Sequence, residues 1–267
     1  MFSLVQSQTI IEVDRINISQ NIIGPNFQPD RFVNTVNGII FLDIDSRQLG
    51  LWSSDSIKLS GGYGTDYAGM FDPVDFLSNQ LDIYLLDGAE NKITRYDNQL
   101  NFIQSFPLTG EDSVLPSFFT IDSRQNFYFY SFETNNIYRT RSLSGQFDTF
   151  LDLTRSGVNN DCIVDFKFST NDNFILLFDC LKELYLFSRS GKLVRRFPLD
   201  IKNPIRAINY NNSWFTINRV GMLQFIDKDP IELKLDGQNI IDVIFYQNLL
   251  YVLTESELII FEIINSK

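Results

Sequence analysis

The sequence predicts an all-β protein, a six-bladed β-propeller built from four-stranded antiparallel blades. Two observations support this fold class. An apolar strand pattern recurs about every forty residues, which is the spacing of propeller blades. The chain also carries an extra strand near its N-terminus and lacks one near its C-terminus, so its two ends can complete one blade and close the ring.

The clearest repeat is an aliphatic residue followed three positions later by a bulky one. Its six copies begin at Leu49, Ile93, Ile137, Leu184, Met222 and Leu258, so the steps between them are 44, 44, 47, 38 and 36 residues. Just before each copy, a second apolar strand ends in a small polar residue. These polar residues are Asp43, Asp87, Ser131, Asp179, Asn218 and Thr254. The short gap between the two strands predicts a tight hairpin in every repeat.

A strand before each hairpin and another after it complete the four strands of a blade. In the second repeat these are residues 74–77 and 102–106. The last repeat has too little chain after Phe261 for a separate fourth strand, whereas residues 9–18 form a strand pattern with no repeat of their own. We therefore expect the N-terminal strand to complete the sixth blade, with residues 8–267 forming one propeller domain.

Composition narrows the function classes. The net charge of −11 is spread along the chain and repels nucleic acid, which is bound through basic surfaces. The chain has no histidine, which removes the commonest general base and the commonest zinc ligand. No apolar run approaches the roughly 20 residues of a membrane-spanning helix. A partner is therefore expected to be neither nucleic acid nor the bilayer interior.

The first seven residues have two interpretations. They form an apolar stub with Val5 and Ser7 at the small-residue positions before Gln8, as at the end of a signal peptide cleaved after Ser7. Residues 1–7 would then be the remnant of an export signal, and the protein would be periplasmic or secreted. The alternative is an ordinary N-terminus on a cytoplasmic protein.

The two cysteines lie at equal distances from the centre of an expected hairpin. Cys162 and Cys180 flank two apolar strands separated by a turn centred on Asn171, which would place them directly opposite each other. A disulfide would fit an exported protein. Two buried free thiols are the alternative, because directly opposed cross-strand cysteines form strained disulfides.

A glycine-rich stretch, residues 61–76, reads GGYGTDYAGMFDPVDF. Its glycine spacing fits neither common phosphate-binding pattern, no lysine follows, and the next element is a strand rather than a helix. We interpret it as the connection from the first blade to the second.

This stretch and its continuation resemble the NHL repeat family. That family's pattern is a glycine-rich loop, an aromatic and a proline before a strand, a strand that ends in aspartate, an asparagine, and an aromatic–aspartate strand end. The matching residues here are Phe71, Pro73, Asp87, Asn91, Tyr96 and Asp97. Pro73 follows Phe71 by two residues, a small departure from the pattern. The resemblance implies a six-bladed propeller and no particular activity. The signatures of the WD-repeat and kelch propellers are absent.

We expect a non-catalytic binding or scaffolding module without a cofactor, because loops on a rigid scaffold concentrate binding residues. The longest connections are residues 20–31, 60–72, 108–117 and 151–161, all on one face of the ring. A protein, peptide or glycan partner would contact the aromatic and charged residues of these and neighbouring loops. They are Phe27, Arg31, Arg47, Tyr63, Asp66, Tyr67, Glu111, Asp112, Arg155 and Asp161.

The alternative function is a calcium-dependent hydrolase, by analogy with lactonase-type propellers that hold calcium in the axial channel. Calcium prefers carboxylate and amide oxygens. The candidate ligands are Glu133, Asn159, Asp161 and Asn218. Asparagine and aspartate are also common turn residues, so their presence does not by itself indicate a metal site.

Overall fold

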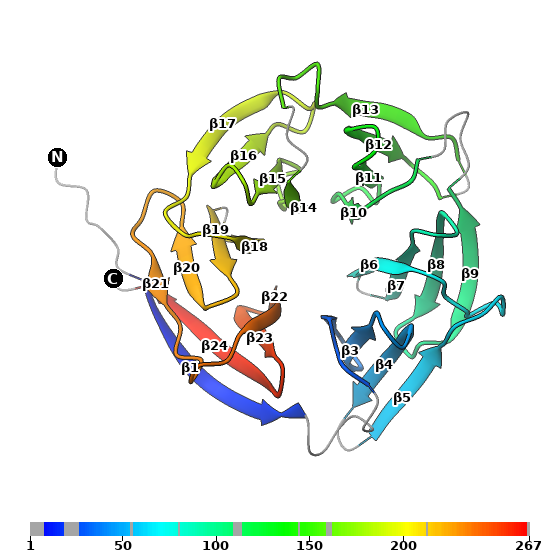
Figure 1. Ribbon diagram of the computed structural model, residues 1–267, viewed down its shortest axis with the longest axis horizontal. Coiled ribbons are helices and arrows are strands. Elements are labelled where there is room, and N and C mark those ends of the chain that lie inside the picture. The colour runs from blue at the N-terminus through cyan, green and yellow to red at the C-terminus, as the bar shows by residue number, and fades with distance from the viewer. Residues whose placement is uncertain are drawn as a thin grey trace.

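The computed structural model describes residues 8–18, 27–53, 56–79, 81–108, 114–143, 145–158, 162–211 and 213–265. Within these residues, 24 strands form six four-stranded antiparallel sheets arranged as the blades of a ring (Figure 1). The predicted six-bladed propeller is confirmed.

In blades 1 to 3 the four strands lie in chain order, from the innermost strand to the outermost. Blade 1 comprises β2 (Arg31–Thr35), β3 (Gly38–Asp43), β4 (Gln48–Ser53) and β5 (Ser56–Gly61). Blade 2 comprises β6 (Pro73–Asn79), β7 (Asp82–Asp87), β8 (Lys92–Asp97) and β9 (Phe102–Pro107). Blade 3 comprises β10 (Phe118–Ile121), β11 (Phe127–Ser131), β12 (Asn136–Thr140) and β13 (Asp148–Asp152).

Blades 4 and 5 repeat this order, and blade 6 takes its outermost strand from the N-terminus. Blade 4 comprises β14 (Ile163–Phe168), β15 (Phe174–Phe178), β16 (Glu183–Phe187) and β17 (Leu193–Pro198). Blade 5 comprises β18 (Pro204–Tyr210), β19 (Ser213–Asn218), β20 (Met222–Phe225) and β21 (Ile231–Glu232). Blade 6 comprises β22 (Ile240–Tyr246), β23 (Leu249–Thr254), β24 (Glu257–Asn265) and β1 (Gln8–Asn17).

The ring closes between the two ends of the chain. β1 pairs antiparallel with β24, from Gln8 opposite Asn265 to Asn17 opposite Glu257. Figure 1 shows these two strands, blue and red, side by side at the outer edge of the ring. The expected completion of the last blade by the N-terminal strand is therefore confirmed. Because this pairing joins the first and last strands, opening the ring would break a complete strand ladder.

The polar residue that ends the second strand of a blade fixes the neighbouring loops. In blade 2, Asp87 accepts hydrogen bonds from the backbone N–H of Phe71 at 2.7 Å and of Glu90 at 3.0 Å. In blade 1, the buried Asp43 accepts them from Gln28 and Ser46 in the same way. One carboxylate thus ties the connection from the preceding strand or blade to the hairpin turn, which explains why this position in the repeat is polar.

The core lies between neighbouring blades rather than at the centre of the ring. One cluster joins Ile40 and Leu42 of blade 1 to Phe76 and Leu85 of blade 2, and comparable clusters join the other neighbours. The second strands β11 and β15 are buried along their whole length, because a blade packs against each of their faces. In the described part of the chain, no helix has the length and apolar character needed to cross a bilayer.

Candidate functional site

The innermost strand of each blade contributes one side chain at the same register position to the axial channel. These residues, the waist ring, lie opposite Leu42, Leu86, Tyr130, Leu177, Ile217 and Leu253 of the second strands. In blade order the waist ring is Arg31, Asp75, Phe118, Asp165, Arg206 and Asp242. All six line one cavity of about 300 Å³. Charge therefore alternates around the channel wall, with one aromatic residue in blade 3.

The three aspartates of the waist ring fasten each even blade to the next odd blade. Asp75 accepts a hydrogen bond from the backbone N–H of Phe119 at 3.2 Å, and Asp165 accepts one from Ala207 at 2.8 Å. Asp242 accepts one from Phe32 at 3.2 Å across the closure of the ring. A β-bulge precedes each aspartate in its strand, and such bulges redirect the side chain that follows them.

Two of the aspartates also pair with arginine. Arg31 Nη1 lies 2.7 Å from Asp75 Oδ1, and Arg206 Nε lies 2.7 Å from Asp242 Oδ1. Burial raises the pKa of the Asp75 carboxyl, although the charges of Arg31 and Arg206 oppose this. Burial alone would lower the pKa of Arg206, but Asp242, Asp165 and Asp75 surround the guanidinium and raise it above its ordinary value.

Asp165 differs from the other two because it has no arginine partner. Its ion-pair partner among the described residues is Lys167, whose Nζ lies 3.8 Å from Oδ2. That separation is too long for a hydrogen bond. The Asp165 side chain is 8% exposed. Two backbone N–H donors and the charge of Arg206 offset its burial in part, but among the described residues no cation lies within hydrogen-bond distance of it.

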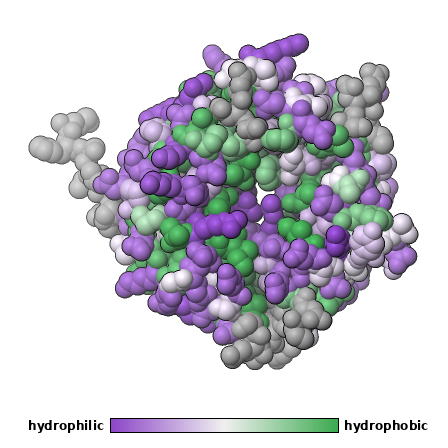
Figure 2. Space-filling view, viewed as in Figure 1, coloured by the Kyte–Doolittle hydropathy of each residue, from purple (hydrophilic) through white to green (hydrophobic). Residues whose placement is uncertain are grey.

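A second and larger cavity opens on the loop face, the face that carries the connections between blades. Its volume is about 610 Å³, and its wall includes Asp30, Arg219 and Glu255. Arg31, Phe118 and Arg206 line both cavities and so separate them. Figure 2 shows the hollow at the centre of the ring, with hydrophilic and hydrophobic side chains both at its edge.

The glycine-rich connection between β5 and β6 crosses itself at close range. Met70 donates its backbone N–H to the Gly62 carbonyl at 2.9 Å, and Gly62 donates to the Arg47 carbonyl at 2.7 Å. A Cβ on Gly69 would lie 2.2 Å from the Gly64 carbonyl oxygen, so a side chain cannot fit there. The glycines therefore permit a backbone crossing between two blades.

This crossing leaves two tyrosines on the surface while Met70 is buried beneath them. Tyr63 and Tyr67 are each 72% exposed. The Tyr63 ring packs edge-on against Phe71 at 5.2 Å, and the Tyr67 ring lies 5.1 Å from Phe102. Arg47 donates Nε to the Phe71 carbonyl at 2.8 Å and lies over the Tyr63 ring at 5.2 Å. Both rings are thus held in fixed positions with most of their surface open.

The structure places the remaining predicted contact residues in different environments. Phe27 is 8% exposed and packs in the core beside Gly50, so the structure leaves little of its ring for the predicted partner contact. Arg31 lies in the channel rather than in a loop. Asp66 is exposed in the turn that Gly69 closes, and the exposed Arg155 pairs with Asp152. Glu111, Asp112 and Asp161 lie outside the described residues.

The residues proposed as calcium ligands fall into two groups. Asn218 is buried and bonds to the Met222 N–H and the Lys202 carbonyl, whereas Glu133 is exposed in a hairpin turn. Asn159 and Asp161 lie outside the described residues. In the part of the chain that the structure describes, no three histidine, cysteine, aspartate or glutamate residues come together as a metal site would require.

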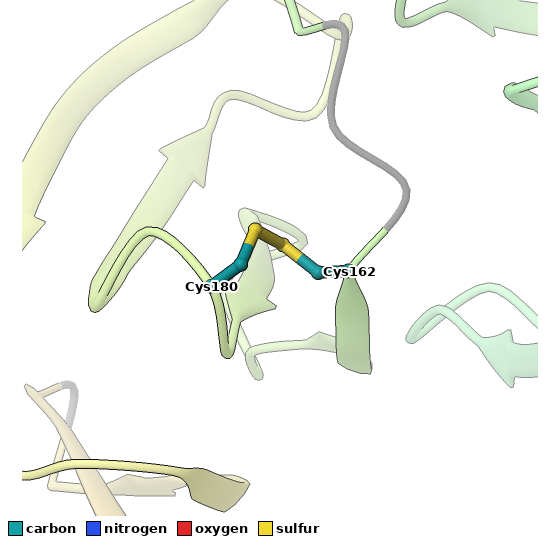
Figure 3. Close-up of a disulfide and its surroundings, with 2 residues drawn as sticks. All are labelled: Cys162 and Cys180. Atoms are coloured by element: carbon teal, nitrogen blue, oxygen red, sulfur yellow. A yellow bond between two sulfur atoms is a disulfide. The ribbon is translucent and has the colours of Figure 1, made fainter.

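Cys162 and Cys180 form a disulfide, with their Cα atoms 5.9 Å apart (Figure 3). The hairpin is centred on Asn171 as expected, because Phe168 pairs with Phe174. The expectation that the cysteines lie directly opposite each other is wrong. A β-bulge at Val164 shifts the register by one residue, so Cys162 accepts the backbone N–H of Asp179 instead. The bond joins the start of β14 to the following turn rather than two paired strand positions.

Sequence reasoning missed most of the waist ring. The signal was a single charged residue inside the apolar first strand of a repeat, as in Val74-Asp75-Phe76, Val164-Asp165-Phe166 and Ile241-Asp242-Val243. Such a residue at a core-facing position requires a partner. The two hairpin strands carry a more regular pattern than this first strand and so dominate the repeat.

Comparisons with known proteins identify the architecture but not a family. No family model matches the chain, so the resemblance to the NHL repeat stays a prediction. No curated protein matches either. Among solved structures, virginiamycin B lyase from Staphylococcus aureus aligns with a TM-score of 0.67 and 14% identity, over 97% of this chain and 100% of that one.

Two further structures share the fold. A catalytically inactive histidine-to-alanine variant of the same lyase, with quinupristin, has a TM-score of 0.62 and 16% identity, over 87% of this chain and 80% of that one. YCF48 bound to the D1 peptide has a TM-score of 0.59 and 8% identity, over 92% of this chain and 78% of that one. At such identities the alignments show the β-propeller fold alone.

Proposed function

We propose that this propeller is a non-catalytic binding module that captures a peptide segment of a protein partner on its loop face. The observation that carries the proposal is the pair Tyr63 and Tyr67, each 72% exposed on a loop that is fixed by its own backbone crossing.

Tyrosine is well suited to this role, since it provides a large contact area at a small cost in side-chain entropy. Ring contacts with Phe71 and Phe102 already hold the two tyrosines, and Arg47 lies beside Tyr63. Less ordering is then needed on binding, which improves affinity. Aromatic and arginine side chains are also the commonest anchors of protein interfaces.

The chain cannot carry out the chemistry of its lyase neighbour through the same kind of residue. That enzyme is inactive when one histidine is replaced by alanine, and this chain contains no histidine. The YCF48 neighbour is bound to a peptide, which supports a peptide as a ligand that this fold accommodates. The tyrosines, rather than the fold, decide where the peptide would lie.

The disulfide between Cys162 and Cys180 supports an oxidising location. Disulfides persist in secreted and periplasmic proteins and are rare in the cytosol. We therefore propose that the module works after export.

A peptide library displayed against the folded protein tests this function. We expect wild type to enrich a peptide family, and the variant carrying both Tyr63→Ala and Tyr67→Ala to lose at least about tenfold in affinity for it, since two interface anchors are removed. Leu81→Ala is the matched control, because Leu81 is 67% exposed in the β6–β7 turn at the opposite end of β6. Equal loss in the control and the tyrosine variant, or no enrichment by wild type, would contradict the proposal.

A further inference from the structure

The waist ring has a threefold pattern that one residue interrupts. In blades 1 and 5 an arginine reaches the aspartate of the following blade, as Arg31 reaches Asp75 and Arg206 reaches Asp242. Blade 3 has Phe118 at that position, so the following aspartate, Asp165, receives no guanidinium. The ring therefore contains three carboxylates and two guanidinium groups around one cavity.

The aspartate that lacks an arginine partner, Asp165, is buried. Asp165 has backbone N–H donors from Phe166 and Ala207, but Lys167 stays 3.8 Å away and is 37% exposed. A buried carboxylate is stabilised well only by a close cation with hydrogen-bond donors. Lys167 and the more distant Arg206 neutralise Asp165 in part, and among the described residues neither cation makes a hydrogen bond to it.

Two other features of the same cavity suit a cation with an apolar stem. Asn34 lines the cavity and its amide contacts Tyr251, while its buried Oδ1 accepts no hydrogen bond from the described residues. The wall is rich in aromatic rings, including Phe118, Phe168 and Tyr246. Rings attract cations at their faces and pack against alkyl chains. At about 300 Å³ the cavity is at the small end of ligand sites and suits one side chain or a small molecule.

We propose that this cavity binds a ligand's alkylguanidinium or alkylammonium group, which pairs with Asp165 in the place that a third arginine would occupy. The group can belong to an arginine or lysine side chain of a protein partner or to a free small amine. The site is separate from Tyr63 and Tyr67, so it can stand or fail independently of the peptide-binding proposal.

An anion is the wrong ligand for this site. Arg31 and Arg206 retain unused N–H groups, but each guanidinium already pairs with a carboxylate. An added anion would bring a fourth negative charge among Asp75, Asp165 and Asp242. A cation instead equalises the charges of the six waist-ring residues and takes the place of Lys167 beside Asp165.

Isothermal titration of the purified full chain with butylguanidinium is the first measurement. We expect saturable binding at one site and none for butylurea, which has the same shape without the charge. Succinate tests for anion binding, and an acetyl-Gly-Arg-Gly-amide peptide tests whether a protein side chain can reach the site. Binding of butylguanidinium alone identifies a free small amine as the ligand, and binding of both identifies a basic side chain.

Three variants localise the site. Asp165→Asn keeps an acceptor for the Ala207 N–H but removes the charge, and should weaken butylguanidinium binding about tenfold or more. Phe118→Arg should fill the site from within and abolish binding. Lys167→Met removes the competing cation and should strengthen binding several-fold. Because Lys167 is partly exposed, this variant should fold even if Phe118→Arg does not.

Matched controls lie outside the cavity. Asp148→Asn makes the same charge change on an exposed position of β13, and Phe132→Arg makes the same substitution in an exposed turn. Both should bind butylguanidinium as wild type does. Equal binding of butylurea, binding of succinate instead, or unchanged affinity in Asp165→Asn would each overturn the proposal.

Discussion

Asp242 connects three blades through one carboxylate. Its Oδ1 lies 2.7 Å from Arg206 Nε of blade 5, and its Oδ2 accepts the backbone N–H of Phe32 in blade 1 at 3.2 Å. These contacts lie on the channel side of the blades, whereas β1 and β24 close the ring at its outer edge. The ring is thus closed on both its inner and its outer side.

Replacing Asp242 by asparagine should therefore destabilise the fold strongly. The change removes the carboxylate to which the buried Arg206 is hydrogen-bonded, and breaking such a buried pair typically costs about 3–5 kcal/mol. Thermal unfolding should show Tm lower by about 6 °C or more for a chain of this size. Asp148→Asn serves as the control and should stay within about 0.5 kcal/mol of wild type. Equal Tm values for the two variants would show that the Arg206–Asp242 pair contributes little.

Gly69→Ala should disrupt the tyrosine loop. The new methyl group would lie 2.2 Å from the Gly64 carbonyl oxygen, so the backbone crossing must open. We expect a lower Tm and faster proteolysis within residues 61–70. In Gly88→Ala the nearest atom is the side-chain oxygen of Asp72, at 3.0 Å, which can move aside. That variant should be milder, and the reverse order would contradict the crossing.

Reduction of the disulfide should lower the stability. Cys162 and Cys180 are 18 residues apart, and a cross-link over that length stabilises the fold by about 3 kcal/mol through the unfolded chain. Tm should fall when a reducing agent is added to wild type. The variant carrying Cys162→Ser and Cys180→Ser should show the lower Tm with or without the reductant. If Tm does not respond to reduction, the bond contributes no stability.

Asp97 should make stability depend on pH in the acid range. Burial alone would raise the pKa of Asp97, but hydrogen bonds from Asn101 and Gln99 and the charge of Lys58 hold it below the usual value. A carboxyl whose pKa is lower in the folded state stabilises the fold above the unfolded pKa of about 3.9, and this contribution is lost as pH falls through the folded pKa. The stability difference between wild type and Asp97→Asn, measured by urea unfolding, should therefore shrink below about pH 4. A difference that is constant from neutral pH to pH 3 would contradict this role.

Calcium should leave the unfolding midpoint unchanged. No metal-binding group of side chains forms within the described residues, so we expect equal Tm in excess EDTA and in millimolar calcium. A ligand that binds the folded state raises Tm by mass action. A clear rise with calcium would favour the hydrolase alternative and direct attention to Asn159 and Asp161.

The number and order of the blades could be predicted because the underlying signals are local. A short apolar pattern that ends in a polar residue such as Asp43 or Asp87 predicts each hairpin. Tyr63 and Tyr67 could also be selected as contact residues, because they lie in a glycine-rich loop. How firmly their positions are fixed depends on the backbone crossing that buries Met70, which the sequence does not show.

Which residues line the channel could not be predicted from these local patterns. Phe27 and Arg31 belong to the same long connection in the sequence, which suggests similar positions for both. In the structure Phe27 is buried in the core, whereas Arg31 lines the channel. A single bulge at Val164 decided that Cys162 faces Asp179 rather than Cys180. Bulges depend on how neighbouring strands pack and leave little trace in the residues themselves.

Six repeats of four strands, and a ring closed by the N-terminal strand, follow from local patterns, because apolar strands separated by turn residues recur along the chain. The waist ring, in contrast, arises only when the six blades assemble. Asp165 and Phe118 are far apart in the chain and become neighbours because closure of the ring brings equivalent positions of different blades onto one axis. Charges placed by that symmetry interact through space, and their balance is a property of the ring rather than of any repeat.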